Sequence, residues 1–456
     1  MEKSALILAA GLGTRMNSDI PKVLHLFDNK PIINRVIEKL LDLEFKKIFI
    51  VIGHKGEMVK EIVEKSFPLY TDKFCFIEQK VLKGSGRAVL ESVDFIKNTQ
   101  SILIISGDVI LIKKQTIEKM YDELFSSDSD CVLLTAVLDN PKSYGRVIRD
   151  KNGDIMAIVE KDELGDKYKD FNEINSGVYI FKTKNLIKAI SDLKPKGRKS
   201  EYYLTDAIEN IKNDNGKIGC VILNDEYEIT GPNSKKELVD LEKEYYLRNA
   251  KLNLEKGVII RDINNTYISE EAVIEGDTII YPGSYIIGRC KIGKNVNIGP
   301  YVMIYDSVIE NNCIIKPFSY IDSSFIKEGS AIGPFSHIRP ECEIGPYAKI
   351  GNFSELKKSK IGKGSKVPHL SYIGDTEMGD DVNIGAGTIT CNYDGKDKHK
   401  TIIGDRAFIG SNTNLVAPIQ IGRDVIIGAG STITDDVPDG KLAIARERQV
   451  IKDRKK

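Results

Sequence analysis

"IIGDRAFIGSNTNLVAPIQIGRDVIIGAGSTI", residues 402–433, carries an aliphatic side chain at every sixth position, at 403, 409, 415, 421, 427 and 433. A glycine often follows that side chain. A period of six is the signature of a parallel β-helix, in which three hexads form one coil and the inward aliphatic side chains stack as ladders. The stretch therefore predicts a solenoid with three flat faces.

The same period extends back through most of the second half of the chain. Aliphatic residues stand six apart at 292, 298 and 304, at 326, 332, 338, 344 and 350, and at 361, 367 and 373. From about residue 258 onward there is room for roughly nine or ten coils. The pattern disappears over residues 385–402, which are therefore predicted to form a loop that leaves the solenoid.

The first 230 or so residues follow a different pattern. Short aliphatic runs such as ALILAA, KIFIVIG, SILIISGD, CVLLTAVL and SGVYIFK alternate with polar-apolar stretches such as PIINRVIEKLLDL. This alternation indicates an α/β domain of parallel strands with helical crossovers. We expect an α/β domain at 1–232, a connecting helix at 233–257 capped by Asn233 or Ser234, and a β-helix at 258–456 that ends in a basic tail.

Composition excludes several classes of protein. Lys+Arg and Asp+Glu are both 66, so no whole-protein field favours nucleic acid or an anionic membrane. The seven cysteines are odd in number, scattered and never in a CxxC, which indicates neither a disulfide framework nor a zinc site. No apolar run approaches a membrane span or a signal peptide. We expect a cytoplasmic protein with no nucleic-acid or membrane partner.

A glycine-rich turn follows the first predicted strand. Residues 8–22, LAAGLGTRMNSDIPK, place Gly11 and Gly13 just before Arg15, with Lys22 a few residues later. Such a turn lets backbone N–H groups approach phosphates while the cations supply charge, although it could also be only a structural turn. Asp108 ends another predicted strand, where α/β sheets bind ligands, and it suits either Mg²⁺ or a loop cap.

The whole string from Leu8 to Lys22 resembles the signature of the sugar-1-phosphate nucleotidyltransferases, and the resemblance implies a domain built on a Rossmann-like mixed sheet. That resemblance implies that Arg15 and Lys22 neutralise the triphosphate, and that Asp108 and Asn233 hold Mg²⁺, Asn233 being alternatively a helix cap. It implies nucleotide contacts at Leu8, Gly11, Gly13, Lys22, Gln79, Gly84 and Ser85, and sugar-phosphate contacts at Gly145, Glu160, Asn175 and Asn233. The chain departs from the family where it has GSGRA at 84–88 and SGD at 106–108.

Several residues of the predicted solenoid are of types that a purely structural β-helix would not need. His369 is one of five histidines and stands in register beside Tyr372. Imidazole, with an unperturbed pKa of about 6.5, suits a base that removes a proton from an attacking amine, the alternative being a surface or core histidine. Arg339 and Lys357 would hold a phosphorylated acceptor, or else are solvated charges.

Nearly the whole chain, in order, resembles the bifunctional N-acetylglucosamine-1-phosphate uridylyltransferase/glucosamine-1-phosphate N-acetyltransferase family, whose acetyltransferase loop contains CNYDG. The resemblance implies a left-handed β-helix, a homotrimer with acetyl-CoA bound between solenoids, and His369 as the base. It assigns the sugar phosphate to Arg339, Lys357, Tyr372 and Asn383, and acetyl-CoA to Asn392, Tyr393, Lys398, Ser411, Ala429 and Arg446. Pro368 and Glu341 depart from the family pattern.

The predicted activity has two steps. Glucosamine-1-phosphate is acetylated by acetyl-CoA, and the product then takes UMP from UTP, with Mg²⁺, to give UDP-N-acetylglucosamine and pyrophosphate. Two alternatives stay open at this point. In the first, the protein is a single-activity nucleotidyltransferase whose β-helix is only an oligomerisation or regulatory scaffold. In the second, the first domain has lost its catalytic activity and only binds its ligands.

Overall fold

The computed structural model describes residues 2–141, 144–160, 163–165, 168, 171–196 and 200–454. These residues form two compact units, one ending at Leu241 and the other beginning at Glu242. The boundary falls within helix α7 (Lys235–Glu255). None of the helices in the described ranges combines the length and the apolarity needed to cross a bilayer.

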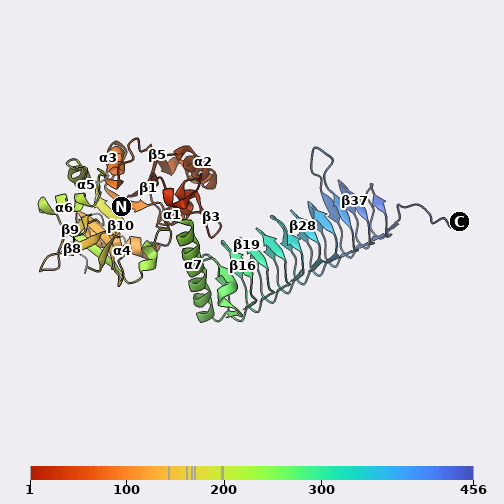
Figure 1. Cartoon of the computed structure of the whole chain (residues 1–456). Helices are drawn as coiled ribbons and strands as arrows, with labels where there is room; N and C mark the ends of the chain where they lie inside the picture. Colours follow the sequence, from red (N-terminus) through yellow and green to blue (C-terminus); the bar gives the residue numbers. More distant parts are fainter. Residues whose placement is uncertain are drawn as a thin grey trace. The chain divides into compact units, whose positions relative to one another are not determined.

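The first unit is built on one mixed sheet (Figure 1). Its strand order is β11 (Ile218–Leu223), β7 (Cys131–Val137), β10 (Glu173–Lys182), β6 (Ser101–Ser106), β1 (Lys3–Leu8), β4 (Lys47–Ile52) and β5 (Phe74–Glu78). Strand β8 (Arg146–Arg149) pairs with β10 and β9 (Ile155–Val159). A separate small ribbon pairs β2 (Leu26–Phe27) with β3 (Lys30–Pro31).

Strand β10 corrects the prediction of parallel strands. The run SGVYIFK lies in β10, which is antiparallel to both neighbours, β6 and β7, whereas β1, β4, β5 and β6 pair in parallel. Parallel neighbours need a long crossover, usually helical, and the described residues between β7 and β10 contain β8 and β9 instead of an α-helix. The sheet is therefore the mixed, Rossmann-like one that the family resemblance implies.

Helices connect and cover the strands of this unit. The α-helices are α1 (Ile32–Asp42), α2 (Gly56–Ser66), α3 (Ser85–Ile96), α4 (Lys114–Ser126), α5 (Thr183–Ile190) and α6 (Asp206–Asn213). Short 3₁₀ turns are η1 (Thr14–Met16), η2 (Lys22–Leu24), η3 (Pro68–Lys73) and η6 (Glu226–Ile229). The predicted helical stretches 31–43 and 84–96 are α1 and α3.

The start of α7 resolves the choice between two helix caps. The Ser234 hydroxyl accepts a hydrogen bond from the Glu237 N–H at 3.2 Å, as an N-cap does. The Glu237 carboxylate in turn accepts from the Asn233 N–H at 2.8 Å. The amide side chain of Asn233 is therefore not the cap, and it takes part in the site described below.

The second unit is a left-handed parallel β-helix whose three faces are parallel sheets (Figure 1). The short turn η7 (Ile263–Asn265) lies between its first two strands. Sheet 1 contains β12 (Ile259–Ile260), β15 (Ile279–Ile280), β18 (Asn297–Ile298), β21 (Ile314–Ile315), β24 (Ala331–Ile332), β27 (Lys349–Asn352), β30 (Lys366–His369), β33 (Asn383–Ile384), β36 (Phe408–Ile409), β39 (Ile426–Ile427) and β41 (Leu442–Ala443).

The other two faces repeat this stacking. Sheet 2 contains β13 (Thr266–Ile268), β16 (Ser284–Ile287), β19 (Met303–Tyr305), β22 (Tyr320–Asp322), β25 (His337–Ile338), β28 (Glu355–Lys357), β31 (Tyr372–Gly374), β34 (Ile389–Cys391), β37 (Asn414–Val416) and β40 (Thr432–Ile433). Sheet 3 contains β14 (Val273–Ile274), β17 (Lys291–Ile292), β20 (Val308–Ile309), β23 (Phe325–Ile326), β26 (Glu343–Ile344), β29 (Lys360–Ile361), β32 (Thr376–Met378), β35 (Thr401–Ile403) and β38 (Ile419–Ile421).

The ladders predicted from the period of six form the core of the β-helix. Every predicted inward position from Ile292 to Ile433 is at most 5% exposed. Most coils therefore contribute one aliphatic side chain per face, and stacking the coils buries these side chains against each other. The β-helix prediction is confirmed.

The loop that leaves the β-helix is shorter than the predicted 385–402. Strand β34 (Ile389–Cys391) still belongs to sheet 2, and β35 begins at Thr401, so only residues 392–400 project (Figure 1). Thr390 occupies the inward position six residues after Ile384 and is 1% exposed. Its hydroxyl accepts a hydrogen bond from the Gly374 N–H at 2.8 Å, so a polar side chain can be buried inside the β-helix. Because this residue is not aliphatic, the six-residue pattern is not visible here in the sequence.

Candidate active sites

The first unit holds a cavity of about 590 Å³ beside the carboxyl ends of β1 and β6. Ligands bind at such strand ends in open α/β sheets. Ten predicted residues line it: Leu8, Gly11, Lys22, Gln79, Gly84, Ser85, Asp108, Gly145, Glu160 and Asn175. Gly13, Arg15 and Asn233 are not part of the lining that the described residues form.

The two glycines of the phosphate turn differ in what they require. Gly13 has φ of +58°, and a Cβ there would lie 2.9 Å from the Lys22 Cβ, so both backbone and packing demand glycine. A Cβ on Gly11 would meet nothing within 4 Å. Gly11 therefore leaves open space in front of the cavity, which a purely structural turn would not need. Arg15 lies in η1 with an exposed side chain.

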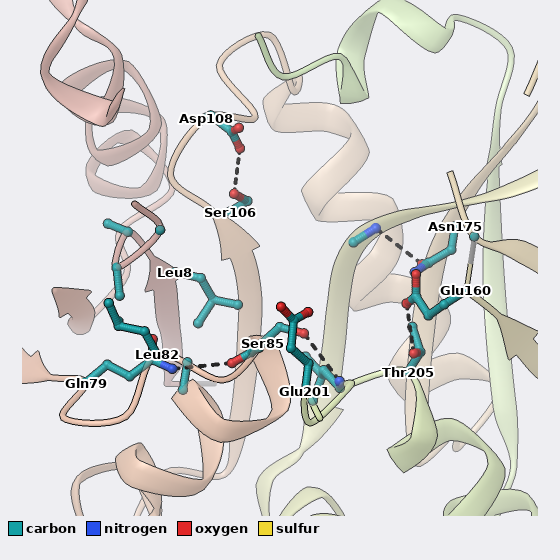
Figure 2. A pocket seen from close by; sticks show the side chains of 18 of the residues that line it. Leu8, Gln79, Leu82, Ser85, Ser106, Asp108, Glu160, Asn175, Glu201 and Thr205 are labelled. Atoms are coloured by element: carbon teal, nitrogen blue, oxygen red, sulfur yellow. Dashed lines mark hydrogen bonds between the residues drawn. The ribbon is translucent and has the colours of Figure 1, made fainter. Parts of the chain in front are cut away.

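Four side chains from distant segments meet at one end of the cavity. The Lys22 ammonium donates to Asp108 Oδ2 in a short contact and to Asn233 Oδ1 at 3.0 Å. The Ser106 hydroxyl donates to Asp108 Oδ1 at 2.5 Å, as Figure 2 shows. Lys22 and Asp108 are only 14% and 15% exposed. A carboxylate and an amide oxygen thus converge on one cation, and oxygen donors of this kind suit Mg²⁺.

The segment 202–204 packs against the loop that carries the predicted nucleotide-binding residues Gln79, Gly84 and Ser85. The Gly86 N–H donates to Tyr202 O at 2.8 Å, the Tyr202 N–H donates to Lys83 O at 2.9 Å, and Ser85 Oγ accepts from the Leu204 N–H at 3.3 Å. Gln79 donates to Val81 O at 3.0 Å and to Gly84 O at 3.3 Å. The chain thereby holds the 79–86 loop in one shape against residues 202–204.

The opposite wall carries the predicted sugar-binding residues. Glu160 accepts from Thr205 Oγ1 at 2.9 Å (Figure 2). Asn175 donates to the Tyr179 hydroxyl at 2.6 Å. Burial raises the pKa of Tyr179 far above its ordinary value, so its hydroxyl stays protonated. Amide and carboxylate oxygens on this wall are arranged to accept hydrogen bonds from a polyhydroxyl ligand.

In the β-helix, His369 lies at the end of β30, at the corner between sheets 1 and 2. Its Nδ1 is 2.8 Å from Asn352 Oδ1, one coil below. An amide oxygen only accepts, so Nδ1 carries a hydrogen in this contact, and the tautomer that the contact favours leaves Nε2 available to accept a proton. That is the form a general base requires.

Cationic side chains lie on sheet 2, the face that follows the corner of His369. Arg339 donates to Glu355 Oε1 at 2.8 Å, and Lys357 stands one coil further on the same face. The neighbouring Lys398, with partial burial, lowers the pKa of Lys357. Tyr372 follows in the next coil of sheet 2, and Asn383 lies in β33 of sheet 1. Crowded cations of this kind favour an anionic ligand such as a phosphate.

The predicted acetyl-CoA positions continue from His369 along the same corner. The Gly387 N–H meets His369 O at 3.4 Å, and Asn412 and Gly430 donate to Ala386 O and Ser411 O at 2.8 Å. Ser411 and Ala429 are therefore corner residues of successive coils, and strands in adjacent coils lie about 4.8 Å apart. Arg446, whose Cδ is the nearest atom to a Cβ built on Gly430, is exposed. The corner offers an extended track for a long ligand.

The 392–400 loop is held by its own hydrogen bonds. Asp394 accepts from the N–H groups of Lys396 and Asp397 at 2.8 and 2.7 Å and pairs with His399 Nε2 at 2.6 Å. His399 and these N–H groups hold the pKa of the Asp394 carboxyl well below its ordinary range. Asn392 donates to Asp375 in a short contact, and Tyr393 is 59% exposed.

The two departures beside this site are accommodated. Glu341 forms an ion pair with Lys358 at 3.0 Å, and Pro368 lies in β30 directly before His369. A Cβ on Gly351 would lie 1.8 Å from Pro368 O, so glycine is obligatory in the coil below. Of the predicted basic tail, Lys455 and Lys456 lie outside the described residues.

Sequence reasoning missed several residues that the fold brings to the sites. Tyr144, Ser176, Tyr179, Glu201, Leu204 and Thr205 line the first cavity, and Asn352 orients His369. The segment 201–205 carries no glycine or phosphate-binding signal, and only its packing on the 83–86 loop brings it there. Asn352 stands 17 residues before His369, which is one coil of the repeat, and that spacing could have revealed the pair.

Comparison with known families agrees with this architecture. Residues 4–233 match the family described as Nucleotidyl transferase. Residues 271–306, 323–358 and 400–435 match the family described as Bacterial transferase hexapeptide (six repeats). Fold and sites together thus define a two-domain transferase, with a nucleotidyltransferase in the first part of the chain and a hexapeptide-repeat transferase in the second.

Full-length relatives narrow this class. The chain is 45% identical over 452 residues to the Bifunctional protein GlmU of Caldanaerobacter subterraneus subsp. tengcongensis, covering 99% of this chain and 97% of that protein. It is 44% identical over 448 residues to the Bifunctional protein GlmU of Carboxydothermus hydrogenoformans, covering 98% of each. The chain belongs to the family of the bifunctional protein GlmU. A solved structure of UDP-glucose pyrophosphorylase complexed with UDP-glucose has a TM-score of 0.44 and 22% identity over 54% of this chain and 100% of its own.

Family membership confirms the prediction of a bifunctional enzyme, with nucleotidyl transfer by one domain and acetyl transfer by the other. It implies UTP and acetyl-CoA as co-substrates. The relatives support this activity and not the alternative of a single-activity enzyme whose β-helix is only a scaffold.

Proposed function

We propose that the cavity of the first unit binds UTP with N-acetylglucosamine-1-phosphate, and that the β-helix corner binds acetyl-CoA with glucosamine-1-phosphate. The observation that carries this proposal is the convergence of ten motif residues from separate segments on one cavity. A second support is the orientation of His369 by Asn352, together with the cations Arg339 and Lys357 on the adjoining sheet 2.

In the acetyl transfer, His369 Nε2 takes a proton from the amine of glucosamine-1-phosphate as that nitrogen attacks the thioester carbonyl. The new C–N bond replaces the C–S bond, and the imidazolium returns the proton to the CoA thiolate. Arg339 and Lys357 hold the acceptor phosphate, and Tyr372 and Asn383 orient its sugar. The 392–400 loop and the corner residues Ser411, Ala429 and Arg446 hold acetyl-CoA.

In the uridylyl transfer, a phosphate oxygen of N-acetylglucosamine-1-phosphate attacks the α-phosphorus of UTP, and pyrophosphate leaves in line. Lys22, Arg15 and the N–H groups of the glycine turn neutralise the phosphates. Mg²⁺, when bound, would supply positive charge that stabilises the reacting phosphates. Asp108 and Asn233 are the residues that would hold it, since their oxygens already converge on a cation.

A homotrimer completes the acetyl site in this proposal. Tyr301, Phe318, Phe335 and Phe353 form a ladder of stacked rings, 4.9–5.3 Å between centroids, at the corner that leads to His369. Each ring is 46–59% exposed, although its backbone has φ of +54° to +59°. The left-handed region costs a non-glycine residue about 1 kcal/mol or more. Burial against another copy of the chain would explain why these apolar rings are exposed in one chain and why their strained backbone conformation is maintained.

We also infer a cytoplasmic location, which the seven free cysteines support. Purified protein would be supplied with glucosamine-1-phosphate, acetyl-CoA, UTP and Mg²⁺, omitting each component in turn, and products identified by mass spectrometry. UDP-N-acetylglucosamine is expected only in the complete mixture.

Two variants serve as each other's control. His369→Ala should lose CoA release about 100-fold or more while keeping uridylyl transfer, and Asp108→Ala should show the reverse. An Asp108→Ala enzyme with normal pyrophosphate release would refute the nucleotidyl site. Unchanged CoA release from His369→Ala would refute the acetyl site.

A further inference from the structure

Every oxygen that would receive a metal ion in the first unit is already occupied by a donor of the chain itself. Lys22 Nζ contacts Asp108 Oδ2 and lies 3.0 Å from Asn233 Oδ1. Ser106 Oγ donates to the other Asp108 oxygen at 2.5 Å. A single ammonium thus stands between the two side chains to which the proposed function assigns Mg²⁺.

The two side chains that carry these oxygens, Asp108 and Asn233, are also restrained by neighbouring groups. The Asn233 N–H donates to Glu237 Oε2 at 2.8 Å, and the Asn233 amide donates to Gly231 O at 3.4 Å. A Cβ on Gly231 would lie 2.9 Å from Asp108 Cγ, so glycine is what permits this close approach. The acceptors therefore cannot turn away to receive a metal while the ammonium stays.

The lysine itself can move without any change of backbone. Lys22 begins η2, whose turn is held by Leu24 N–H to Pro21 O at 2.9 Å and His25 N–H to Lys22 O at 3.2 Å. Its Cβ lies 2.9 Å from where a Gly13 Cβ would stand, so its stem packs on the phosphate-binding turn. From that root the flexible four-carbon chain reaches either Asp108 or a phosphate cradled by the turn.

We propose that Lys22 is a placeholder cation, which occupies the metal position in the free enzyme and leaves it when nucleotide phosphates draw it to the glycine turn. This proposal rests on the proposed function of the site. Two cations cannot share the same two oxygens at hydrogen-bonding distance. The free enzyme therefore binds a divalent ion weakly, and nucleotide and metal strengthen each other's binding reciprocally.

The test measures metal binding and not turnover. Mn²⁺ is the probe, and its free concentration is followed by electron paramagnetic resonance in titrations of the full-length protein. Lys22→Met removes the ammonium and keeps the length of the stem. Lys97→Met is the matched control, since Lys97 pairs with Asp94 at the surface of the same unit. Each protein is titrated with and without a UTP analogue whose α–β bridge resists cleavage.

Without nucleotide, Lys22→Met should bind Mn²⁺ about tenfold more tightly than the wild type, because a charged hydrogen bond no longer competes. With the analogue, the wild type should gain Mn²⁺ affinity and Lys22→Met should gain much less. Equal or weaker Mn²⁺ binding by nucleotide-free Lys22→Met overturns the proposal, provided that its first unit unfolds at the wild-type temperature in differential scanning calorimetry.

Asp108→Asn separates this inference from the function on which it rests. If Asp108→Asn binds Mn²⁺ as well as the wild type in the presence of the analogue, the metal assignment itself is wrong and the placeholder role falls with it. If Asp108→Asn loses Mn²⁺ but Lys22→Met gains none, the metal site stands and only the placeholder role is refuted.

Discussion

His369 Nδ1 lies 2.8 Å from the Asn352 amide oxygen of the preceding coil, and this contact selects the ring tautomer that leaves Nε2 free to accept a proton. Asn352 and His369 are paired in register between β27 and β30. The β-helix therefore orients its base through the same parallel pairing that stacks its coils.

Replacing Asn352 should change acetyl transfer in two distinguishable ways. Asn352→Ala releases the ring and should lower kcat for CoA release about tenfold, a part of what a general base contributes. Asn352→Asp places a carboxylate beside the imidazole, raises the pKa of His369 and should move the acidic limb of the pH–rate profile to higher pH. A profile that keeps its position in Asn352→Asp would contradict the orienting role. Pyrophosphate release is the internal control.

The aromatic ladder yields a prediction about assembly. Phe335→Glu places a charge between two stacked rings and should shift the protein from trimer to monomer in sedimentation velocity. CoA release should fall about tenfold or more with it, since hot-spot truncations cost that much in binding, while uridylyl transfer persists. Val273→Glu, at a 60% exposed position of sheet 3, is the matched control. A trimer that survives in Phe335→Glu would place the interface elsewhere.

The acetyl-CoA loop should depend on Asp394. Asp394→Ala removes the acceptor shared by His399 and two N–H groups, so the loop should become mobile. Trypsin should then cut after Lys396 or Lys398 several times faster, and KM for acetyl-CoA should rise several-fold. Asp397→Ala, whose side chain has no part in these bonds, is the control. Equal cleavage of the two variants would show that the clamp does not order the loop.

The Arg149–Glu173 ion pair should make the stability of the first unit depend on pH. Burial alone would raise the pKa of Glu173, but hydrogen bonds from Arg149 and Thr135 at 2.7 and 2.8 Å outweigh burial and lower it. A lowered folded-state pKa gives stability that is full above the unfolded pKa of about 4.3 and is lost as pH falls through the folded pKa.

Glu173→Gln should therefore destabilise the first unit by about 2 kcal/mol at pH 7, since charge-assisted bonds are lost. The difference from the wild type should begin to shrink as the pH falls below the unfolded pKa of about 4.3, and it should vanish only below the lowered folded-state pKa of Glu173, where both side chains are neutral. The thermal loss of uridylyl activity measures the stability of the first unit, and the thermal loss of CoA release measures the stability of the second. A difference independent of pH would show that packing and not charge stabilises the pair.

The site residues fall into two groups: those whose role can be predicted from the sequence, and those whose role depends on a partner that only the fold brings near. Gly11, Gly13, Lys22 and Asp108 could be proposed from the sequence because phosphate and metal binding require particular residue types at strand ends. Ser106 and Thr205 carry no such signal, since each acts through a partner that only the fold brings near. The same holds for Asn352, whose role is defined by its pairing with His369 of the next coil.

The sequence by itself determined the β-helix, because a six-residue period of aliphatic side chains can be buried only by stacking coils. It also determined the α/β class of the first unit and the family. Only the tertiary structure decided that β10 runs antiparallel, that Thr390 is inside the prism, and that Lys22 stands between Asp108 and Asn233. Those facts depend on contacts between distant segments, where pairing partners, hydroxyl acceptors and neighbouring charges are supplied by the fold and leave no local pattern.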